Sequence, residues 1–217
     1  MKHLLMVCGL VILLVACGAP RDEEIEITGS GILVRRPFDL DGFRRIDASS
    51  AARVSVIQAG EYRVELVVDD NVEPYVDVRV DDETLHVTLE DGTYTGITLQ
   101  LQVSMPELAG ITLDGGSSAR GEVTGDALAV GVHGGSLAIL GGSVRDLTVN
   151  AAGGSQALLG DLAAVDVVLD VGGASRVQIN ASGEVTGVAN GSSTVSVSGS
   201  PTSVDVETNG GSSVNRE

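Results

Sequence analysis

The residues best able to do chemistry in this chain gather at Gly-Ser corners in its second half. His133 precedes a Gly pair, and Asp114 holds the equivalent place 19 residues earlier. Ser117 and Ser136 follow the same two Gly pairs, so the three residue types of a Ser-His-Asp triad come together. Stacked corners make Asp114 and His133 neighbours automatically, however, and a triad also needs an oriented base and an oxyanion site. We therefore predict no catalytic residue.

Acidic loops in the first half form a second candidate site. They contain Asp69-Asp70, Asp81-Asp82-Glu83 and Glu90-Asp91, and such carboxylates can bind Ca²⁺. Neither the EF-hand spacing nor the Gly-Gly-x-Gly-x-Asp nonapeptide of calcium-binding β-rolls is present. Turn formation and edge charge explain these residues equally well, so we predict no metal site and no cofactor.

A carbohydrate-active β-helix enzyme remains an alternative. Such an enzyme would need acids or arginines clustered on one outer strand face. Arg120 and Arg176 each follow a Gly corner, but no acids align with both. His86 lies within a strand, on the face opposite to Leu85 and Val87, so we expect it to be exposed.

The N-terminus has the pattern of an export signal. Lys2 supplies positive charge, and residues 4–14 form an apolar run too short to span a bilayer. Leu14-Val15-Ala16-Cys17 follows and resembles the lipobox of bacterial lipoproteins. That resemblance implies cleavage between Ala16 and Cys17, with a diacylglyceryl group on Cys17 and a further acyl chain, such as palmitate, on the new N-terminus.

This signal divides the chain into three parts. We expect a lipoprotein signal peptide at 1–16, a lipidated tether at 17–27 and a folded domain at 28–217. Two or more acyl chains anchor a protein stably, so we expect a location in the cell envelope, with the membrane as a partner. Gly18, rather than Asp, follows the cysteine, which favours the outer membrane if the cell is Gram-negative.

The composition of the mature chain excludes several classes of site and partner. Cys8 leaves with the signal peptide and Cys17 is lipidated, so the domain has no thiol for a disulfide, a metal or a nucleophile. Twelve arginines against thirty acids give 12 − 30 = −18, a charge that repels nucleic acids. The last aromatic residue is Tyr94, which argues against glycan binding by ring stacking in the repeats.

One phrase recurs from Gly115 to the C-terminus and predicts the fold. It is Gly-Gly-Ser-Ser or a close variant, and its anchors are Ser117, Ser136, Ser155, Ala174, Ser192 and Ser212, at steps of 19, 19, 19, 18 and 20 residues. Apolar residues alternate before and after each corner, which is typical of strands with one buried face. A period of this length predicts stacked turns. We therefore expect an all-β protein, a single-stranded parallel β-helix (β-solenoid) with turns of about 19 residues.

Two parts of the chain depart from the repeat. Val165, Val167, Leu169 and Val171 alternate one residue out of phase with their Gly pair, which would point Asp170 inward, so we expect a bulge that restores the phase. The half before Gly115 also consists of short alternating segments, without the repeated phrase. A sandwich could have this spacing, but we expect less regular turns of the same solenoid.

Several residues before the repeats fall into the order of a known family. They are Gly29-Ser30-Gly31, Arg36 with Phe38, Gly42-Phe43 with Ile46, Val54 and Val56 leading to Gln58 and Gly60, and Pro106, Leu108 and Ile111 before Gly115-Gly116-Ser117. In this order they resemble the head-GIN domain, a family of bacterial exported proteins described as autotransporter adhesins. The resemblance implies that the parallel β-helix is right-handed, that the domain has no established catalytic residues and that it acts in adhesion.

Together these features favour a non-catalytic binding or adhesion module, anchored by lipid in the cell envelope. A protein or a matrix polymer is the expected partner, and the last turn, ending at Glu217, offers an open strand edge for weak self-association. The alternatives are the carbohydrate-active enzyme and a structural envelope protein without a dedicated ligand.

Overall fold

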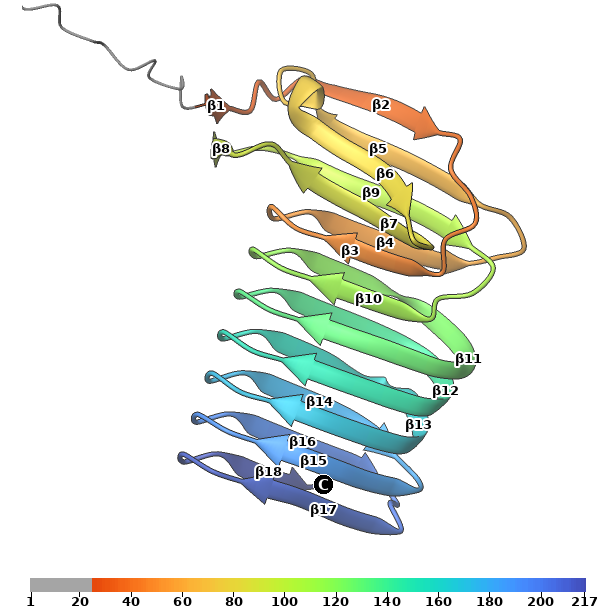
Figure 1. Ribbon diagram of the computed structural model, residues 1–217, viewed down its shortest axis with the longest axis vertical. Helices are drawn as coiled ribbons and strands as arrows, with labels where there is room; N and C mark the ends of the chain where they lie inside the picture. Colours follow the sequence, from red (N-terminus) through yellow and green to blue (C-terminus); the bar gives the residue numbers. More distant parts are fainter. Residues whose placement is uncertain (1–24) are drawn as a thin grey trace, which may run out of the picture.

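The computed structural model describes residues 25–217, so Ala16, Cys17 and the predicted signal peptide lie outside the described part. These residues form an all-β solenoid of about six turns that winds with a right hand (Figure 1). Each turn has a front strand, a tight corner, a back strand and a wider arc leading to the next front strand (Figure 1). The predicted fold class is confirmed. None of the helical structure in residues 25–217 is long and apolar enough to cross a membrane.

The strands form two facing layers joined by the arcs. The front sheet contains, in order, β6 (Val76–Asp81), β7 (Thr84–Leu89), β3 (Arg45–Ala48), β10 (Gly110–Leu113), the second halves of β11 (Ser118–Val132), β12 (Leu137–Ala151) and β13 (Gln156–Val171), β15 (Glu184–Ala189) and β17 (Ser203–Thr208). The back sheet contains β2 (Leu33–Phe38), β5 (Arg63–Asp69), β9 (Leu99–Met105), β4 (Arg53–Gln58), the first halves of β11, β12 and β13, β14 (Arg176–Ala181), β16 (Thr194–Gly199) and β18 (Ser213–Arg216). β1 (Ile25–Thr28) pairs with β8 (Gly92–Thr95), and η1 (Glu73–Tyr75) is a short 3-10 turn.

Aliphatic ladders fill the space between the two sheets. In the front sheet, directly paired residues of successive turns are Leu113, Val132, Ala151, Val171 and Ala189. Each of these five side chains is at most 1% exposed. Burial of such apolar surface is the main stabilising contribution, and each turn completes it only by contact with its neighbours.

The corners are held by backbone conformation and by buried hydroxyl groups. Gly115 and Gly116 have φ of 59° and 78°, a left-handed pair of conformations that glycine adopts without strain. The serine that follows is buried and bonds to the next turn: the backbone N–H of Ser117 donates to Oγ of Ser136 at 3.1 Å. The N–H of Ser155 donates to Oγ of Ser175 at 3.3 Å in the same way. An internal ladder of serines therefore ties the turns together.

This ladder corrects the alignment of two repeats. The buried serines at the fourth and fifth corners are Ser175 and Ser193, whereas Ala174 and Ser192 occupy the left-handed position before them, with φ of 62° and 64°. The predicted anchors Ala174 and Ser192 were thus one residue early. Their identity was hidden because an alanine and a serine stand where the other corners have glycine.

Replacing Ala174 by glycine is expected to raise the free energy of unfolding by about 1 kcal/mol, because the left-handed strain of a Cβ is removed. The equivalent Gly154 has open space where a Cβ would lie, so backbone strain is the term being tested. Urea unfolding measures the change. Ala129→Gly, in an exposed strand position, is the matched control and is expected to lose up to about 1 kcal/mol. Equal losses in both variants would contradict this account.

The predicted bulge is present in the arc of β13. The β12–β13 pairing shifts by one residue between Ile139 and Gly142, where Ile139 pairs with Leu158 but Gly142 pairs with Leu162. After this shift Asp170 pairs with Asn150 on the exposed side of the front sheet. The extra residue restores the phase and keeps the carboxylate in water.

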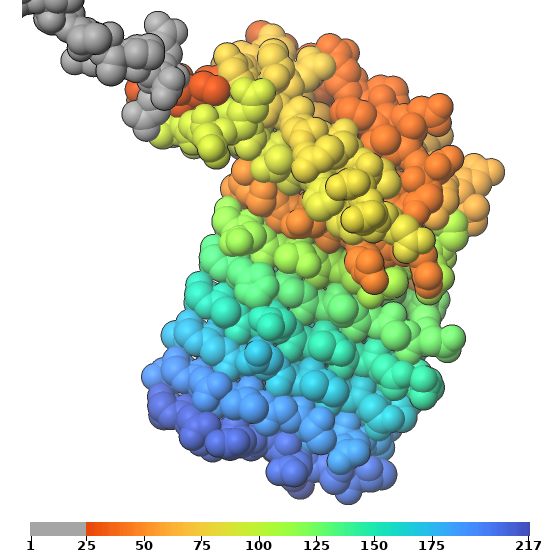
Figure 2. Space-filling view, viewed as in Figure 1, coloured from red at the N-terminus to blue at the C-terminus, as the bar shows by residue number. Residues whose placement is uncertain are grey.

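The N-terminal region is less regular than the repeats, and its strands do not follow sequence order. β3 lies between β7 and β10 in the front sheet, and β4 lies between β9 and β11 in the back sheet. β5 pairs antiparallel with β2 and β9, and β6 pairs antiparallel with β7. The strands β2, β5 and β6 cover the end of the column (Figure 1). Figure 2 shows this intermixing as orange and yellow segments above the ordered green and blue layers. The sequence predicted less regular turns here, and it did not predict the antiparallel cap.

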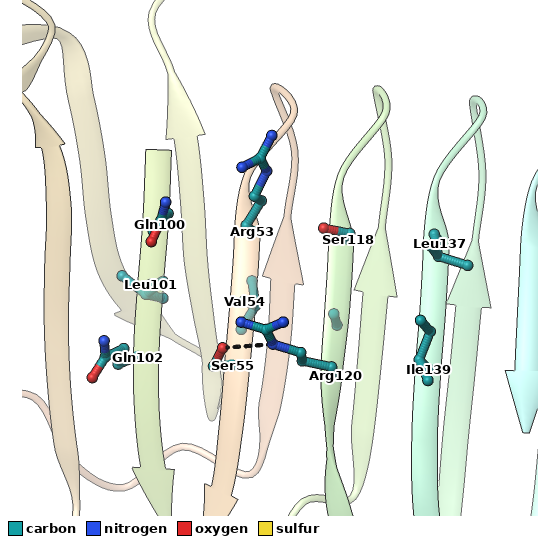
Figure 3. Close-up of a pocket in the computed structure, with 11 residues that line it drawn as sticks. Arg53, Val54, Ser55, Gln100, Leu101, Gln102, Ser118, Arg120, Leu137 and Ile139 are labelled. Atoms are coloured by element: carbon teal, nitrogen blue, oxygen red, sulfur yellow. Dashed lines mark hydrogen bonds between the residues drawn. The ribbon is translucent and has the colours of Figure 1, made fainter. Parts of the chain in front are cut away.

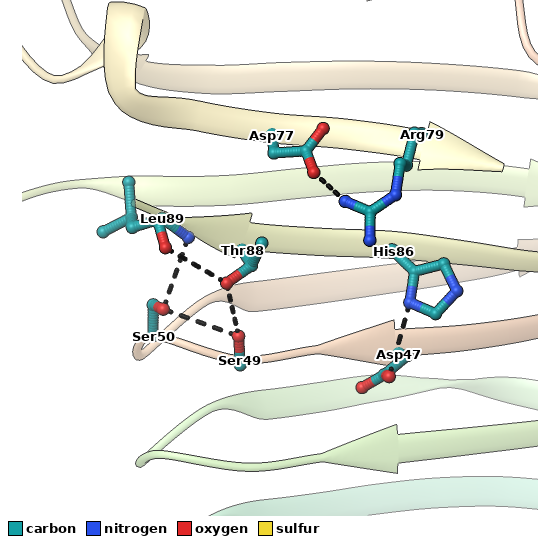
Figure 4. Close-up of polar contacts among 8 residues, drawn as sticks. All are labelled: Asp47, Ser49, Ser50, Asp77, Arg79, His86, Thr88 and Leu89. Atoms are coloured by element: carbon teal, nitrogen blue, oxygen red, sulfur yellow. Dashed lines mark hydrogen bonds and ion pairs between the residues drawn. The ribbon is translucent and has the colours of Figure 1, made fainter. Parts of the chain in front are cut away.

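Polar contacts fix the out-of-order strand β7 against β3 (Figure 4). Nδ1 of His86 lies 3.4 Å from Oδ2 of Asp47, and the hydroxyls of Ser49 and Thr88 are 2.9 Å apart. Ser49 begins a further corner of the solenoid, in which Ser50 and Ala51 have φ of 61° and 60° without any glycine. His86 therefore serves to join two turns that are 39 residues apart in sequence.

Candidate functional site

The Ser-His-Asp candidates are not assembled into a triad. Ser117 and Ser136 are 0% and 1% exposed, and both hydroxyl groups face the interior. Oγ of Ser117 accepts the backbone N–H of Ala52 at 3.1 Å, and Oγ of Ser136 accepts that of Ser117. These hydroxyls belong to the internal ladder, out of reach of a substrate.

Asp114 and His133 lie outside the corner and do not contact each other as an ion pair. Oδ1 of Asp114 accepts the backbone N–H of Gly115 at 2.6 Å, which caps its own turn. Nε2 of His133 lies over Gly131, 3.4 Å from the place of a Cβ on that glycine. The pairing of a histidine with an acid in residues 25–217 involves His86 and Asp47 instead.

The acidic loops do not converge on a cation site. Asp69 is 1% exposed, and its oxygens accept the backbone N–H groups of Gly31 at 2.7 Å and Thr98 at 2.6 Å. Oδ1 of Asp70 accepts the hydroxyl of Ser30. Across residues 25–217, no group of three His, Cys, Asp or Glu side chains is placed to hold a metal ion.

Arginines distinguish the outer face of the back sheet. Of the described arginines, five pair with acids, namely Arg35, Arg36, Arg44, Arg79 and Arg145. Hydrogen bonding to Glu73 raises the pKa of Arg36 and lowers the pKa of Glu73, and Glu107 raises the pKa of Arg44 similarly. The described arginines that lack an acidic partner are Arg45, Arg53, Arg63, Arg120, Arg176 and Arg216. Five of these lie in strands of the back sheet, and four of the five are exposed next to a buried strand residue and so lie on its outer face: Arg53, Arg63, Arg120 and Arg176.

The front sheet has the opposite charge. Its outward positions on β12, β13, β15 and β17 carry Asp146, Asp166, Asp170, Glu184, Asp205 and Glu207. A depression of about 490 Å³ lies on this sheet over Gly110 and Gly131, with His86, Asp47 and Asn150 on its rims. The two faces of one acidic column thus offer different electrostatic surfaces to a partner.

A groove of about 330 Å³ lies on the back sheet around Arg53 and Arg120 (Figure 3). Ser55 and Ser118 are the small residues within it, and Gln100 and Gln102 of β9 form one side. Leu137 and Ile139 of β12 form the other side, and Ile139 is 45% exposed. We call these eight residues the arginine groove.

The side chain of Arg120 crosses this groove. Its Nε donates to Oγ of Ser55 on the neighbouring strand at a long 3.4 Å, so the guanidinium keeps most of its donors for a ligand (Figure 3). Glu122, two residues further on β11, folds over Gly141 and forms no ion pair with Arg120. The arrangement can bind an anion and hydrogen-bond polar groups, with an apolar wall beside it.

Arg120 and Arg176 are recognisable in the sequence as residues that follow Gly corners, but the groove is not. An enzyme site would have required acids in line with both arginines, and the sequence has none there. Arg53 escaped notice because β4 pairs with β11 across 65 residues, so Arg53 and Ser118 become direct partners. The placement of β4 between β9 and β11 leaves no repeated pattern in the sequence from which it could be predicted.

Comparison with known proteins agrees with the geometry. The model of one family, described as "Putative auto-transporter adhesin, head GIN domain", matches residues 42–201. The chain belongs to the head GIN domain family. No curated protein matches it.

Solved structures share the fold of this head GIN domain at low sequence identity. One described as a "putative adhesin", from Bacteroides fragilis, has a TM-score of 0.66 and 19% identity, covering 88% of this chain and 100% of its own. Another "putative adhesin", from Parabacteroides merdae, has a TM-score of 0.56 and 15% identity, covering 88% and 99%. A "putative lipid binding protein" from Parabacteroides distasonis has a TM-score of 0.53 and 15% identity, covering 89% and 100%. These likenesses establish the fold.

Proposed function

We propose that this head GIN protein is a lipid-anchored, non-catalytic binding or adhesion module of the bacterial cell envelope. The observation that carries the proposal is the arginine groove, a polar, cationic surface on the side of the column. The Ser-His-Asp candidates of the same column are not assembled into a triad. The family description and the adhesin-like structural relatives support the same role. Weak self-association through the edge formed by β17 and β18 stays a prediction.

The anchor that we propose is Cys17, and the place where the described chain begins suits display of a binding face. β1, which begins at Ile25, lies at the end of the column covered by β2, β5 and β6 (Figure 1). A tether attached there leaves the repeated turns projecting from the membrane, with both sheets accessible. We place the protein in the outer membrane if the cell is Gram-negative.

Changing Cys17 to serine is expected to abolish lipid attachment, because serine lacks the thiol that accepts the diacylglyceryl group. Labelled palmitate should enter the wild-type chain and not the variant, and the variant should leave the membrane fraction. Cys8→Ser is the matched control and should label normally.

In the bacterium of origin, deletion of the gene is expected to reduce surface attachment several-fold. The wild-type chain should restore attachment, and the Cys17→Ser variant should not.

The same deletion separates the proposal from its alternatives. Unchanged attachment together with a leaky envelope would instead establish a structural role. Turnover of an acidic polysaccharide by the purified protein, lost on changing His133 or Asp114, would establish an enzyme.

A further inference from the structure

We propose that the arginine groove binds a carboxylate-bearing polysaccharide lying along the column, a ligand of the uronic acid class. This inference rests on the proposed binding function and names its ligand chemistry. It starts from the distribution of charge, because a strongly acidic chain keeps Arg53, Arg63, Arg120 and Arg176 free of acidic partners on one sheet.

The guanidinium groups recognise the carboxylates. Arginine presents planar donors that match a carboxylate in a bidentate pair, and such charge-assisted bonds are stronger than neutral ones. Arg53 and Arg120 lie on the adjacent strands β4 and β11, two residues apart in register. The opposite sheet carries acids at its outward positions, so an anionic polymer would be repelled there.

The cationic positions continue beyond the groove and favour a polymer over a small anion. Arg53 pairs with Ser118, which is followed through Leu137 and Gln156 to Arg176. These four strand spacings place Arg176 roughly 19 Å from Arg53. A ligand that reaches both must extend over several sugar units.

The polar and apolar groups beside the arginines suit a polyhydroxylated chain. Gln100, Gln102 and Ser118 provide amide and hydroxyl groups that can donate to and accept from sugar hydroxyls. Leu137 and Ile139 give an apolar wall for the C–H face of a sugar ring. Recognition through carboxylates replaces aromatic stacking here, because no aromatic residue lines the groove.

A peptide is the less suitable polyanion for this surface. Extended peptides bind commonly by adding a strand to a sheet edge, where backbone donors and acceptors are free. The arginine groove lies on the face of a sheet whose backbone groups are engaged in parallel ladders with β9, β11 and β12. Only side chains are presented, which suits hydroxyl and carboxylate groups.

Binding to polygalacturonate, measured by calorimetry with the full chain in a non-ionic detergent, tests the proposal. Wild-type protein should bind it at least about tenfold more tightly than neutral dextran or poly-L-glutamate. The R53Q/R120Q variant should lose at least about tenfold in affinity, because two charge-assisted pairs are removed. R45Q/R79Q removes the same charge from the front sheet and should change affinity less than about twofold.

A second variant works in the opposite direction. Glu122→Gln removes an acid from the back sheet and should strengthen binding about twofold or more, which loss of folding cannot imitate. Absence of polygalacturonate binding, equal loss in both double variants, or equally tight binding of poly-L-glutamate would overturn the proposal. If polygalacturonate does not bind but gene deletion still reduces attachment, the ligand class is wrong and the adhesion module stands.

Discussion

Alanine in place of Gly142 is expected to lower the free energy of unfolding by roughly 4 kcal/mol, because two separate costs combine. Gly142 has φ of 110°, a conformation that L-residues rarely adopt. A Cβ there would lie 2.1 Å from the carbonyl oxygen of Val123, in the adjacent turn. That oxygen belongs to the parallel ladder and cannot move without separating β11 from β12.

Gly160 provides the matched control for this substitution. It lies in the equivalent arc of the next turn, its φ is not positive, and no atom lies within 4 Å of a Cβ placed there. Gly160→Ala is expected to change stability by less than about 1 kcal/mol. Urea unfolding of both variants measures the difference, and similar values for the two would show that the arc is deformable.

The repeated half of the fold could be predicted because the same packing and the same corner conformation recur in every turn. Each turn buries the same aliphatic positions and bends at the same left-handed pair, so the sequence must repeat wherever the structure does. The out-of-phase segment around Asp170 was also predictable, because an inward carboxylate would be costly. The anchors predicted at Ala174 and Ser192 were displaced by one residue, because at these two corners the left-handed position is not occupied by glycine.

The cap and the arginine groove could not be predicted for a different physical reason. Their contacts join segments far apart in sequence, such as Arg53 with Ser118 and His86 with Asp47. The corner from Ser49 to Ala52 contains no glycine, although its backbone has the same left-handed pair as the other corners. Tertiary contact compensates for the local strain there, and no local pattern records it.

The link between tether and column depends on a buried carboxylate. Asp69 lies at the end of β5, and its two oxygens hold the backbone of Gly31 and Thr98. Beside it, Asn71 accepts the N–H of Ser30 at 3.0 Å and donates to the carbonyl of Thr28 at 2.8 Å. The segment that joins the predicted tether to β2 is therefore held by residues 69–71, in addition to the pairing of β1 with β8. A pull on the anchor proposed at Cys17 would load these bonds together with that pairing.

Replacing Asp69 by alanine is expected to lower the free energy of unfolding by about 3 kcal/mol, because the N–H groups of Gly31 and Thr98 both lose a charged, buried acceptor. Asp70→Ala is the matched control next in sequence. Its exposed carboxylate accepts only the Ser30 hydroxyl among the described contacts, so a loss below about 1 kcal/mol is expected. Urea unfolding gives both values, and hydrogen exchange at Gly31 and Thr98 should accelerate in the Asp69 variant alone. Equal stability of the two variants would mean that water replaces the buried carboxylate and that the cap does not depend on it.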